Sequence, residues 1–319
     1  MRTMEDNSVS AIVCDPPYGL SSSKKAKSGF MGKEWDAKTP DVEIWREALR
    51  IAKPGSHLLA FGGTRTFHRL ACSIEDAGWS VRDCISWIYA SGWPKSHNFG
   101  RQLGGDWQGY GSCMKPAWEP VLVCSKKLDG TFIQNAQKHG VAGINIDDSR
   151  VDGKRWPANL ILDEVAADLL DQQSGISASR PDKRSGNRAG KGGINCYAGG
   201  WKDQPNSLND SGGASRFFFV AKASASERNQ GLEGIKNIHP CIKPIKLMEY
   251  LIKLVMPPAG GILLDPFAGS GSTIVAATRL GYEAIGIEKE AEYCQIAEAR
   301  VKHAQEELEK QQQQMKFAF

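Results

Sequence analysis

Long apolar runs are missing from this chain of 319 residues. Residues 1–6 are mostly polar or charged, and no later stretch reaches the roughly 20 apolar residues that a membrane-spanning helix needs. A signal peptide and a membrane anchor are therefore not expected. The sequence also contains no internal repeat, which argues against solenoid and propeller folds.

Cysteine pairs at metal-binding or redox spacing are also absent. The eight cysteines are scattered, and no two of them have the two-residue separation of a zinc or disulfide-exchange site. We therefore expect no metal, and we expect reduced thiols that act mostly as small core residues.

A strong overall charge is lacking as well, because the formal net charge is only +4. The charge is unevenly spread. Residues 174–228 carry nine Lys or Arg against four Asp or Glu, an excess of five that is larger than that of the whole chain. This segment is therefore expected to contact a polyanion.

Strand-like and helix-like segments alternate over most of the chain, as a parallel α/β sheet requires. Strands are expected at residues 9–14, 57–61, 80–89, 118–124, 159–162, 262–264 and 284–287. Helices are expected at residues 41–52, 65–77, 164–170 and 245–255, and from residue 290 onward. Beyond residue 126 the pattern dissolves for about ninety residues, and so long a loop is usually functional or disordered.

The first candidate site is the motif Asp15-Pro16-Pro17-Tyr18, which directly follows the apolar run 11–14. Two consecutive prolines hold the loop stiff and leave its carbonyl groups free to accept hydrogen bonds. Together with a carboxylate and an aromatic ring, they make a rigid acceptor site suited to a planar amine. An ordinary turn at the end of a strand would also explain these four residues.

The second candidate site is a glycine turn, residues 265–271, which follows the apolar run 262–264. The third glycine of a dinucleotide fingerprint is replaced by Ile274, so a nicotinamide dehydrogenase is a poor fit. Glu288 ends the next strand-like run about twenty residues later, where an acid usually binds ribose hydroxyls. A solvated glutamate at a strand end is the alternative.

A third segment, residues 237–244, contains His239-Pro240 and Lys243-Pro244 just before the helix expected at 245–255. The three elements, in this order along the chain, resemble the permuted motifs of the β-class DNA amino-methyltransferases, the adenine-N6 and cytosine-N4 DNA methylase family. Weaker matches to phage and prophage members are found at four further places: Trp35-Asp36, Arg82-Asp83 with Trp87, Trp118-Glu119-Pro120 and residues 215–218.

The resemblance implies an α/β fold, a Rossmann-like S-adenosylmethionine-dependent methyltransferase sheet with a circularly permuted motif order. It divides the chain into a catalytic half of the core (1–126), an inserted DNA target-recognition region (127–215) and a cofactor-binding half (216–319). The residues expected to bind S-adenosylmethionine are Asp265, Phe267, Ala268, Gly269, Gly271, Ser272, Glu288 and Lys243.

The implied reaction is site-specific methylation of the exocyclic N6 of an adenine in double-stranded DNA. Asp15 and the Pro16 carbonyl are expected to accept hydrogen bonds from the amine, while Tyr18 stacks on a base rotated out of the duplex at a cost of about a few kcal/mol. The methyl group moves by direct in-line displacement, without a cysteine nucleophile. Cytosine-N4 methylation and a catalytically silent DNA-binding relative are the alternatives, and a protein or RNA methyltransferase fits less well.

DNA contacts are expected in two glycine-rich and basic stretches, where Arg and Lys neutralise phosphates and aromatic rings stack on bases. The candidate residues are Lys24, Lys25, Lys27, Arg184, Arg188, Lys191, Tyr197 and Trp201. A flexible surface linker is the alternative for residues 185–193, and a solvated loop is the alternative for residues 21–33. The family implies a cytoplasmic, nucleoid-associated protein of bacterial or phage origin, as in restriction–modification systems, and a homodimer stays open.

Overall fold

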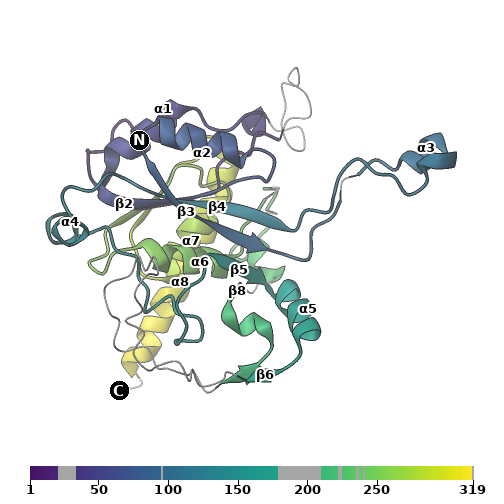
Figure 1. Ribbon diagram of the computed structural model, residues 1–319. Helices are drawn as coiled ribbons and strands as arrows, with labels where there is room; N and C mark the ends of the chain where they lie inside the picture. The colour runs from purple at the N-terminus through teal and green to yellow at the C-terminus, as the bar shows by residue number, and fades with distance from the viewer. Residues whose placement is uncertain are drawn as a thin grey trace, which may run out of the picture.

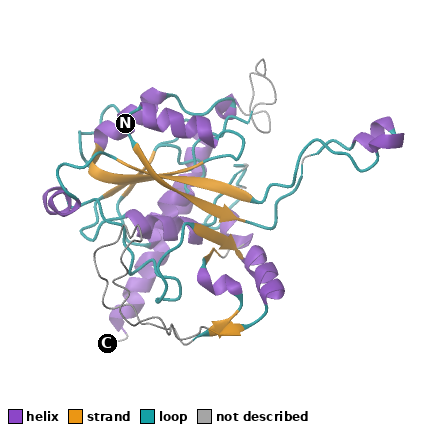
Figure 2. Ribbon diagram, viewed as in Figure 1, coloured by secondary structure: helices purple, strands orange, loops and turns teal. Residues whose placement is uncertain are grey.

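The computed structural model describes residues 1–20, 34–94, 96–178, 210–221, 225–234, 237–239 and 241–317. The body is an eight-stranded sheet with the order β10-β9-β1-β2-β4-β3-β5-β8, covered by helices on both faces (Figures 1 and 2). Its strands are β1 (Val9–Cys14), β2 (Ala52–Phe61), β3 (Ser80–Ile88), β4 (Trp118–Ser125), β5 (Leu160–Asp163), β8 (Phe219–Ala221), β9 (Ile262–Asp265) and β10 (Ala284–Gly286). A separate pair is formed by β6 (Ser177–Ala178) and β7 (Ser211–Gly212).

Most helices lie on the two faces of the sheet or at its ends, whereas α3 lies far from it (Figure 1). They are α1 (Val42–Ile51), α2 (Phe67–Asp76), α3 (Phe99–Leu103), α4 (Phe132–His139), α5 (Glu164–Ser174), α6 (Ile245–Val255), α7 (Ser272–Arg279) and α8 (Ala291–Phe317). Short 3₁₀ turns are η2 (Glu34–Asp36), η3 (Gly105–Trp107), η4 (Ala214–Phe217) and η5 (Ala225–Asn229).

The core has two layers because β1 is buried at every position and its side chains point alternately to both faces. On one face, Ile12 and Leu58 pack with Trp45 of α1 and Leu70 of α2. On the other face, Val13 packs with residues of α6 and α7. Figure 1 shows α1 and α2 on one side of the sheet and α6, α7 and α8 on the other.

The expected α/β fold is confirmed, but the sheet, which was expected to be parallel, is mixed. Strand β4 runs antiparallel to both β2 and β3, whereas the other pairings in the large sheet are parallel. β3 and β4 are joined by residues 89–117, which leave the sheet and return to it at the same end of these strands. The second strand must therefore run in the opposite direction to the first.

Part of the expected inserted region, 127–215, is built into this sheet, because β5 pairs with β3 and β8. Helix α4 also falls in this region and was not expected. It begins at a capping box, in which the Thr131 side chain accepts a hydrogen bond from Gln134 N and the Gln134 side chain accepts one from Thr131 N. The division of the chain into three stretches stays a prediction.

Among the residues that the structure describes, no helix is long and apolar enough to cross a membrane. In the same part of the chain, no group of three or more His, Cys, Asp or Glu side chains is arranged to hold a metal ion.

Candidate active site

The acceptor motif and the glycine turn meet at one edge of the sheet. β1 and β9 are parallel neighbours, with Ile12 paired to Leu264, so Asp15 and Asp265 leave their strands at the same carboxyl edge. β4 is antiparallel to β2 and therefore begins at this edge, which brings Glu119 there. In open α/β sheets, ligands bind at this edge.

Asp15 forms a cluster with three other polar side chains, those of Tyr18, Glu119 and Lys243. Lys243 Nζ lies 2.6 Å from Asp15 Oδ2, 3.1 Å from the Tyr18 hydroxyl and 3.4 Å from Glu119 Oε2. The Tyr18 oxygen lies 2.9 Å from Asp15 Oδ1 and 2.9 Å from Glu119 Oε2, and its single proton can serve one of these carboxylates at a time. We call these four residues the acceptor cluster.

The acceptor cluster is partly closed to solvent. The Lys243 side chain is 7% exposed, and those of Asp15 and Glu119 are 20% and 21% exposed. The Lys243 ammonium also lies 4.8 Å from the centre of the Phe61 ring and 5.4 Å from that of Tyr18. A carboxylate edge therefore remains open to a ligand while the ammonium is enclosed.

The charges in the cluster govern its protonation. Burial lowers the pKa of Lys243, but the carboxylates of Asp15 and Glu119 outweigh this effect and raise its pKa above the ordinary value, so the ammonium stays charged. Burial, followed by the charges of the same two carboxylates, raises the pKa of Tyr18 well above its ordinary range. Tyr18 is therefore a neutral phenol that can donate a hydrogen bond.

The backbone around Tyr18 is fixed from outside the motif. Asp36 Oδ1 accepts hydrogen bonds from Tyr18 N at 2.6 Å and from Gly19 N at 3.0 Å, and the Thr66 hydroxyl donates to the Tyr18 carbonyl. Gly63 lies under the ring, since a Cβ there would come within 3.0 Å of Tyr18 Cδ2. Tyr18 is thus positioned by two separate segments of the chain, one at Asp36 and one at residues 63–66.

The glycine turn is held by a short set of hydrogen bonds. Gly269 (φ 52°) and Gly271 (φ 80°) have left-handed backbone angles, which glycine adopts without strain. Glu288 Oε2 accepts from Gly269 N at 2.8 Å, and Glu288 Oε1 accepts from Lys289 N at 2.8 Å and Glu290 N at 2.9 Å. A carboxylate has about four acceptor positions, so one position of Glu288 remains for a ligand hydroxyl.

The other residues expected to bind the cofactor also lie in or beside this turn. Ala268 and Ser272 are buried, and the Ser272 hydroxyl accepts a hydrogen bond from Arg300 at 3.3 Å. The Phe267 ring packs 5.7 Å from that of Trp45. Lys243 lies against Asp15 in the acceptor cluster, and the cofactor contacts of all these residues stay predictions.

Asp265 is buried and acts on the turn itself. Its Oδ1 accepts a hydrogen bond from Phe267 N at 2.9 Å, and its other oxygen accepts one from the Thr273 hydroxyl. Burial raises its pKa to about 7, although both hydrogen bonds oppose the shift. Deprotonation of Asp265 is therefore unfavourable inside the folded protein.

A pH-dependent stability follows from Asp265. Because its pKa is higher in the folded state than in the unfolded one, its stabilising effect is complete below the unfolded value of 3.8 and is lost as the pH rises through about 7. We expect the wild type to lose about a few kcal/mol relative to Asp265→Asn between acidic and mildly alkaline pH. Urea unfolding of both proteins across this range measures the difference, and parallel curves would contradict the assignment.

His239 lies between the two halves of the site. Its ring is stacked on that of Trp35 at 5.8 Å and meets the edge of Tyr293 at 4.7 Å. A Cβ on Gly269 would come within 2.9 Å of His239 Nε2, so the ring closes directly on the glycine turn. Burial lowers the pKa of His239, which favours a neutral packing residue.

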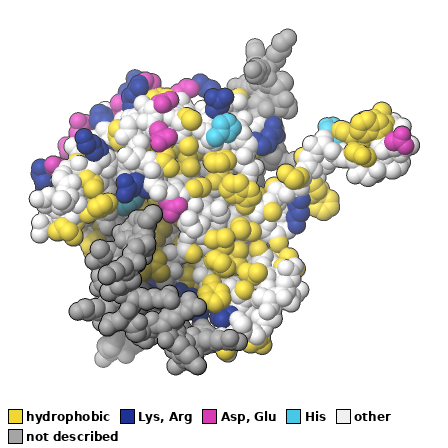
Figure 3. Space-filling model, viewed as in Figure 1, with side chains coloured by type: hydrophobic (Ala, Val, Ile, Leu, Met, Phe, Trp, Pro, Cys, Tyr) yellow, Lys and Arg dark blue, Asp and Glu magenta, His cyan; other side chains and the backbone are white. Residues whose placement is uncertain are grey.

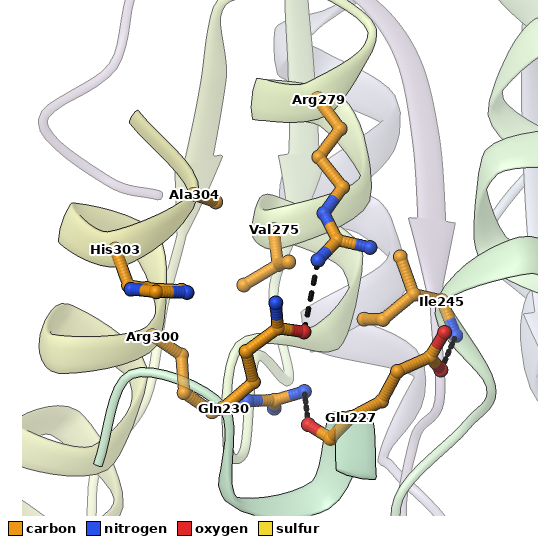
Figure 4. Close-up of a pocket in the computed structure, with 8 residues that line it drawn as sticks. All are labelled: Glu227, Gln230, Ile245, Val275, Arg279, Arg300, His303 and Ala304. Carbon is orange, nitrogen blue, oxygen red and sulfur yellow. Dashed lines mark hydrogen bonds between the residues drawn. The ribbon is translucent and has the colours of Figure 1, made fainter. Parts of the chain in front are cut away.

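A small hollow is lined by residues of α6, α7 and α8 together with Glu227 and Gln230 (Figure 4). Its volume is about 10 Å³, which is a single water-sized space. Its polar side chains are bonded to protein groups: Arg279 to Gln230 at 3.0 Å, and Arg300 to the Ser270 hydroxyl at 3.1 Å. Arg300 therefore links the lining of the hollow to Ser270 of the glycine turn, and the hollow is too small for a nucleoside.

The structure thus brings Asp15, Pro16, Pro17 and Tyr18 together with Lys243, and adds Glu119, to which no role was assigned from the sequence. The only sequence signal for Glu119 was its place in Trp118-Glu119-Pro120. The residues expected to bind DNA lie outside the described ranges: Lys24, Lys25, Lys27, Arg184, Arg188, Lys191, Tyr197 and Trp201.

The chain is similar to several known proteins. A family model described as DNA methylase matches residues 9–299. The type II methyltransferase M.HindIII of Haemophilus influenzae is 26% identical over 91% of this chain and 87% of its own length. M2.DpnII of Streptococcus pneumoniae is 49% identical over 63 residues, which are 20% of this chain and 23% of that protein. Among solved structures, the cytosine-N4-specific PvuII DNA methyltransferase has a TM-score of 0.47 at 16% identity, covering 94% of this chain and 81% of its own.

Proposed function

Because the chain belongs to the DNA methylase family of N6 and N4 amino-methyltransferases, we propose that it methylates the exocyclic N6 of an adenine rotated out of double-stranded DNA. The observation that carries this proposal is the acceptor cluster, in which a carboxylate, a phenol, a second carboxylate and a buried ammonium converge at the end of β1. The methyl donor is S-adenosylmethionine.

Asp15 binds the amine through the acceptor positions that Lys243 and Tyr18 leave free. An aromatic amine is a weak nucleophile because its lone pair is conjugated into the ring. Hydrogen bonds from its N–H groups to Asp15 and to the Pro16 carbonyl draw it toward a form with a localised lone pair. The Tyr18 ring, held by Asp36 and Gly63, provides a stacking face for the base.

Glu119 gives the acceptor cluster its charge. With both carboxylates ionised, Asp15 and Glu119 contribute two negative charges and Lys243 contributes one positive charge, which leaves a net charge of −1. During methyl transfer the amine nitrogen becomes positive, so a net negative site stabilises the transition state. Without Glu119, the Asp15–Lys243 pair would be neutral.

The glycine turn fits S-adenosylmethionine. Glu288 keeps one acceptor position for a ribose hydroxyl, and Gly269 and Gly271 give the turn its tight left-handed path next to that carboxylate. When bound, S-adenosylmethionine supplies an electrophilic methyl group. Asp265 keeps the turn closed, and the nearby His239 packs on Gly269, between the turn and the acceptor cluster.

The choice of adenine rests on Asp15, since cytosine-N4 enzymes more often begin this motif with serine. Sequencing that detects modified bases, applied to DNA from cells that express the chain, tests the proposal and gives the target sequence as well. N6-methyladenine at a defined site supports it. N4-methylcytosine would show that the substrate is cytosine instead of adenine. Unmodified DNA would favour the alternative that the chain is a DNA-binding relative without catalytic activity.

A cofactor prediction concerns Glu288. We expect Glu288→Ala to weaken S-adenosylmethionine binding about tenfold or more, because a ribose contact is lost and Gly269 N loses its acceptor. Calorimetry measures the affinity, with Glu292→Ala, an exposed acid in the first turn of α8, as the control. If both variants bind like the wild type, the cofactor is held elsewhere.

A DNA prediction concerns the basic stretch within the proposed target-recognition region, 127–215. We expect neutralisation of Arg184, Arg188 and Lys191 together to weaken DNA binding and to lower the salt dependence by roughly one unit of slope per lost phosphate contact. Cofactor affinity is expected to stay constant. A triple variant with the wild-type slope would make the stretch a linker. A homodimer remains a proposal that sedimentation would test.

A further inference from the structure

The connection between β3 and β4 is a built arm, residues 89–117, and not a loose loop. Its two limbs are joined by hydrogen bonds from Tyr89 N to Ala117 O at 3.0 Å and from Phe99 N to Tyr110 O at 3.1 Å. The limbs also approach closely at their base, where a Cβ on Gly92 would come within 1.8 Å of the Pro116 carbonyl oxygen. Figure 1 shows the arm projecting away from the body with α3 at its tip.

The tip of the arm has a small aromatic centre that remains exposed. Trp107 meets Phe99 at 5.6 Å and Tyr110 at 5.5 Å, both edge to face. Trp107 is nevertheless 46% exposed and Tyr110 59% exposed, and on the limbs Trp93 and Met114 are 81% and 91% exposed. Apolar side chains gather at the tip in Figure 3. A patch of this kind, held out in water, marks an interaction surface.

The root of the arm belongs to the acceptor site. Glu119, two positions after the arm ends, contacts Tyr18 and Lys243. The root is clamped, since Asp163 accepts a hydrogen bond from Ala90 N at 3.2 Å and Lys115 Nζ donates to the Ala90 carbonyl. Any duplex whose base reaches Asp15 therefore lies next to the start of the arm.

We propose that the arm lies in a groove of the DNA beside the rotated base, an inference that rests on the proposed function. A two-stranded ribbon fits the major groove. Each limb spans roughly 30 Å if extended, close to one turn of duplex at about 34 Å. The arm's sequence has three Lys or Arg against one Asp, and its described polar side chains include the exposed Arg101. Aromatic rings with basic and small polar residues are the composition that binds bases and phosphates.

The test compares variants of the arm in the full chain, once methylation by the wild type has been shown. Trp107→Ala with Tyr110→Ala is expected to weaken binding of a labelled duplex of mixed sequence roughly tenfold or more. Arg101→Ala is expected to lower the salt slope by roughly one unit. Arg46→Ala, an exposed side chain of α1 that lies outside both the arm and residues 127–215, is the control and should bind like the wild type.

Calorimetry with S-adenosylmethionine and sedimentation complete the experiment. Weaker DNA binding with unchanged cofactor affinity and unchanged mass supports the proposal. DNA affinity equal to the wild type overturns it, and so does a fall in mass, which would assign the arm to a second copy of the chain. A shortened arm, with Gly-Gly in place of residues 97–112, repeats the comparison if the point variants disturb the tip. Absent methylation by the wild type would instead reject the proposed function.

Discussion

Asp15→Ala is expected to reduce methyl transfer about a thousandfold or more, in line with the loss of a group that acts directly on the reacting centre. The carboxylate is the proposed acceptor that polarises the target amine, and the alanine variant leaves only the Pro16 carbonyl. The variant also removes the partner that lies 2.6 Å from Lys243 Nζ, so the ammonium retains only Glu119 and Tyr18. Methyl incorporation into DNA under single-turnover conditions measures the loss.

The proposed role of Asp15 predicts a loss of methyl transfer without a loss of cofactor binding. S-adenosylmethionine affinity is expected to stay close to that of the wild type, because the glycine turn and Glu288 are held by hydrogen bonds of their own. Asp15→Asn preserves the volume and one acceptor oxygen, and its activity should fall between the other two proteins. Substantial activity in Asp15→Ala, in a variant with the wild-type circular dichroism spectrum, would overturn the acceptor role.

Much of the fold could be predicted because buried parallel strands can be recognised in the sequence as short apolar runs. β1 and α6 were predicted with the bounds that the structure shows, and β9 and β10 to within one residue at each end. The direction of β4 could not be predicted, since a short buried apolar run has the same pattern in either direction. Helix α4 was overlooked although Thr131 and Gln134 form a visible capping box.

The acceptor cluster contains contacts between distant residues that local sequence patterns cannot predict. Asp15 and Tyr18 lie three positions apart and could be predicted from one motif. Lys243, however, lies 228 positions from Asp15, and Glu119 lies 101 positions from Tyr18. Their meeting depends on the order of β4, β2 and β1 in the sheet and on the entry of α6, which only the tertiary structure specifies. The sequence placed Lys243 by resemblance near the cofactor, and the structure places it on the acceptor carboxylate.

Lys243→Met is expected to reduce methyl transfer about a hundredfold, because Asp15 loses the ammonium that holds it in position and the net charge of the acceptor cluster changes from −1 to −2. The carboxylates of Asp15 and Glu119, which share the Tyr18 hydroxyl, then face each other without a cation, and their repulsion moves Asp15 away from the amine. Lys246→Met is the control, since Lys246 lies three positions further on in α6, is largely exposed and pairs with Glu249. Its activity is expected to equal that of the wild type.

Glu119→Gln makes the opposite change, from −1 to zero, and is expected to cost about ten- to a hundredfold in rate with little effect on cofactor affinity. The double variant Lys243→Met with Glu119→Gln returns the net charge to −1 on Asp15 alone. If charge is what these residues contribute, the double variant is at least as active as Lys243→Met, and the two losses do not add. If they only fill space around Asp15, the losses add. Single-turnover rates of the four proteins, with unfolding curves to show that each is folded, decide between these outcomes.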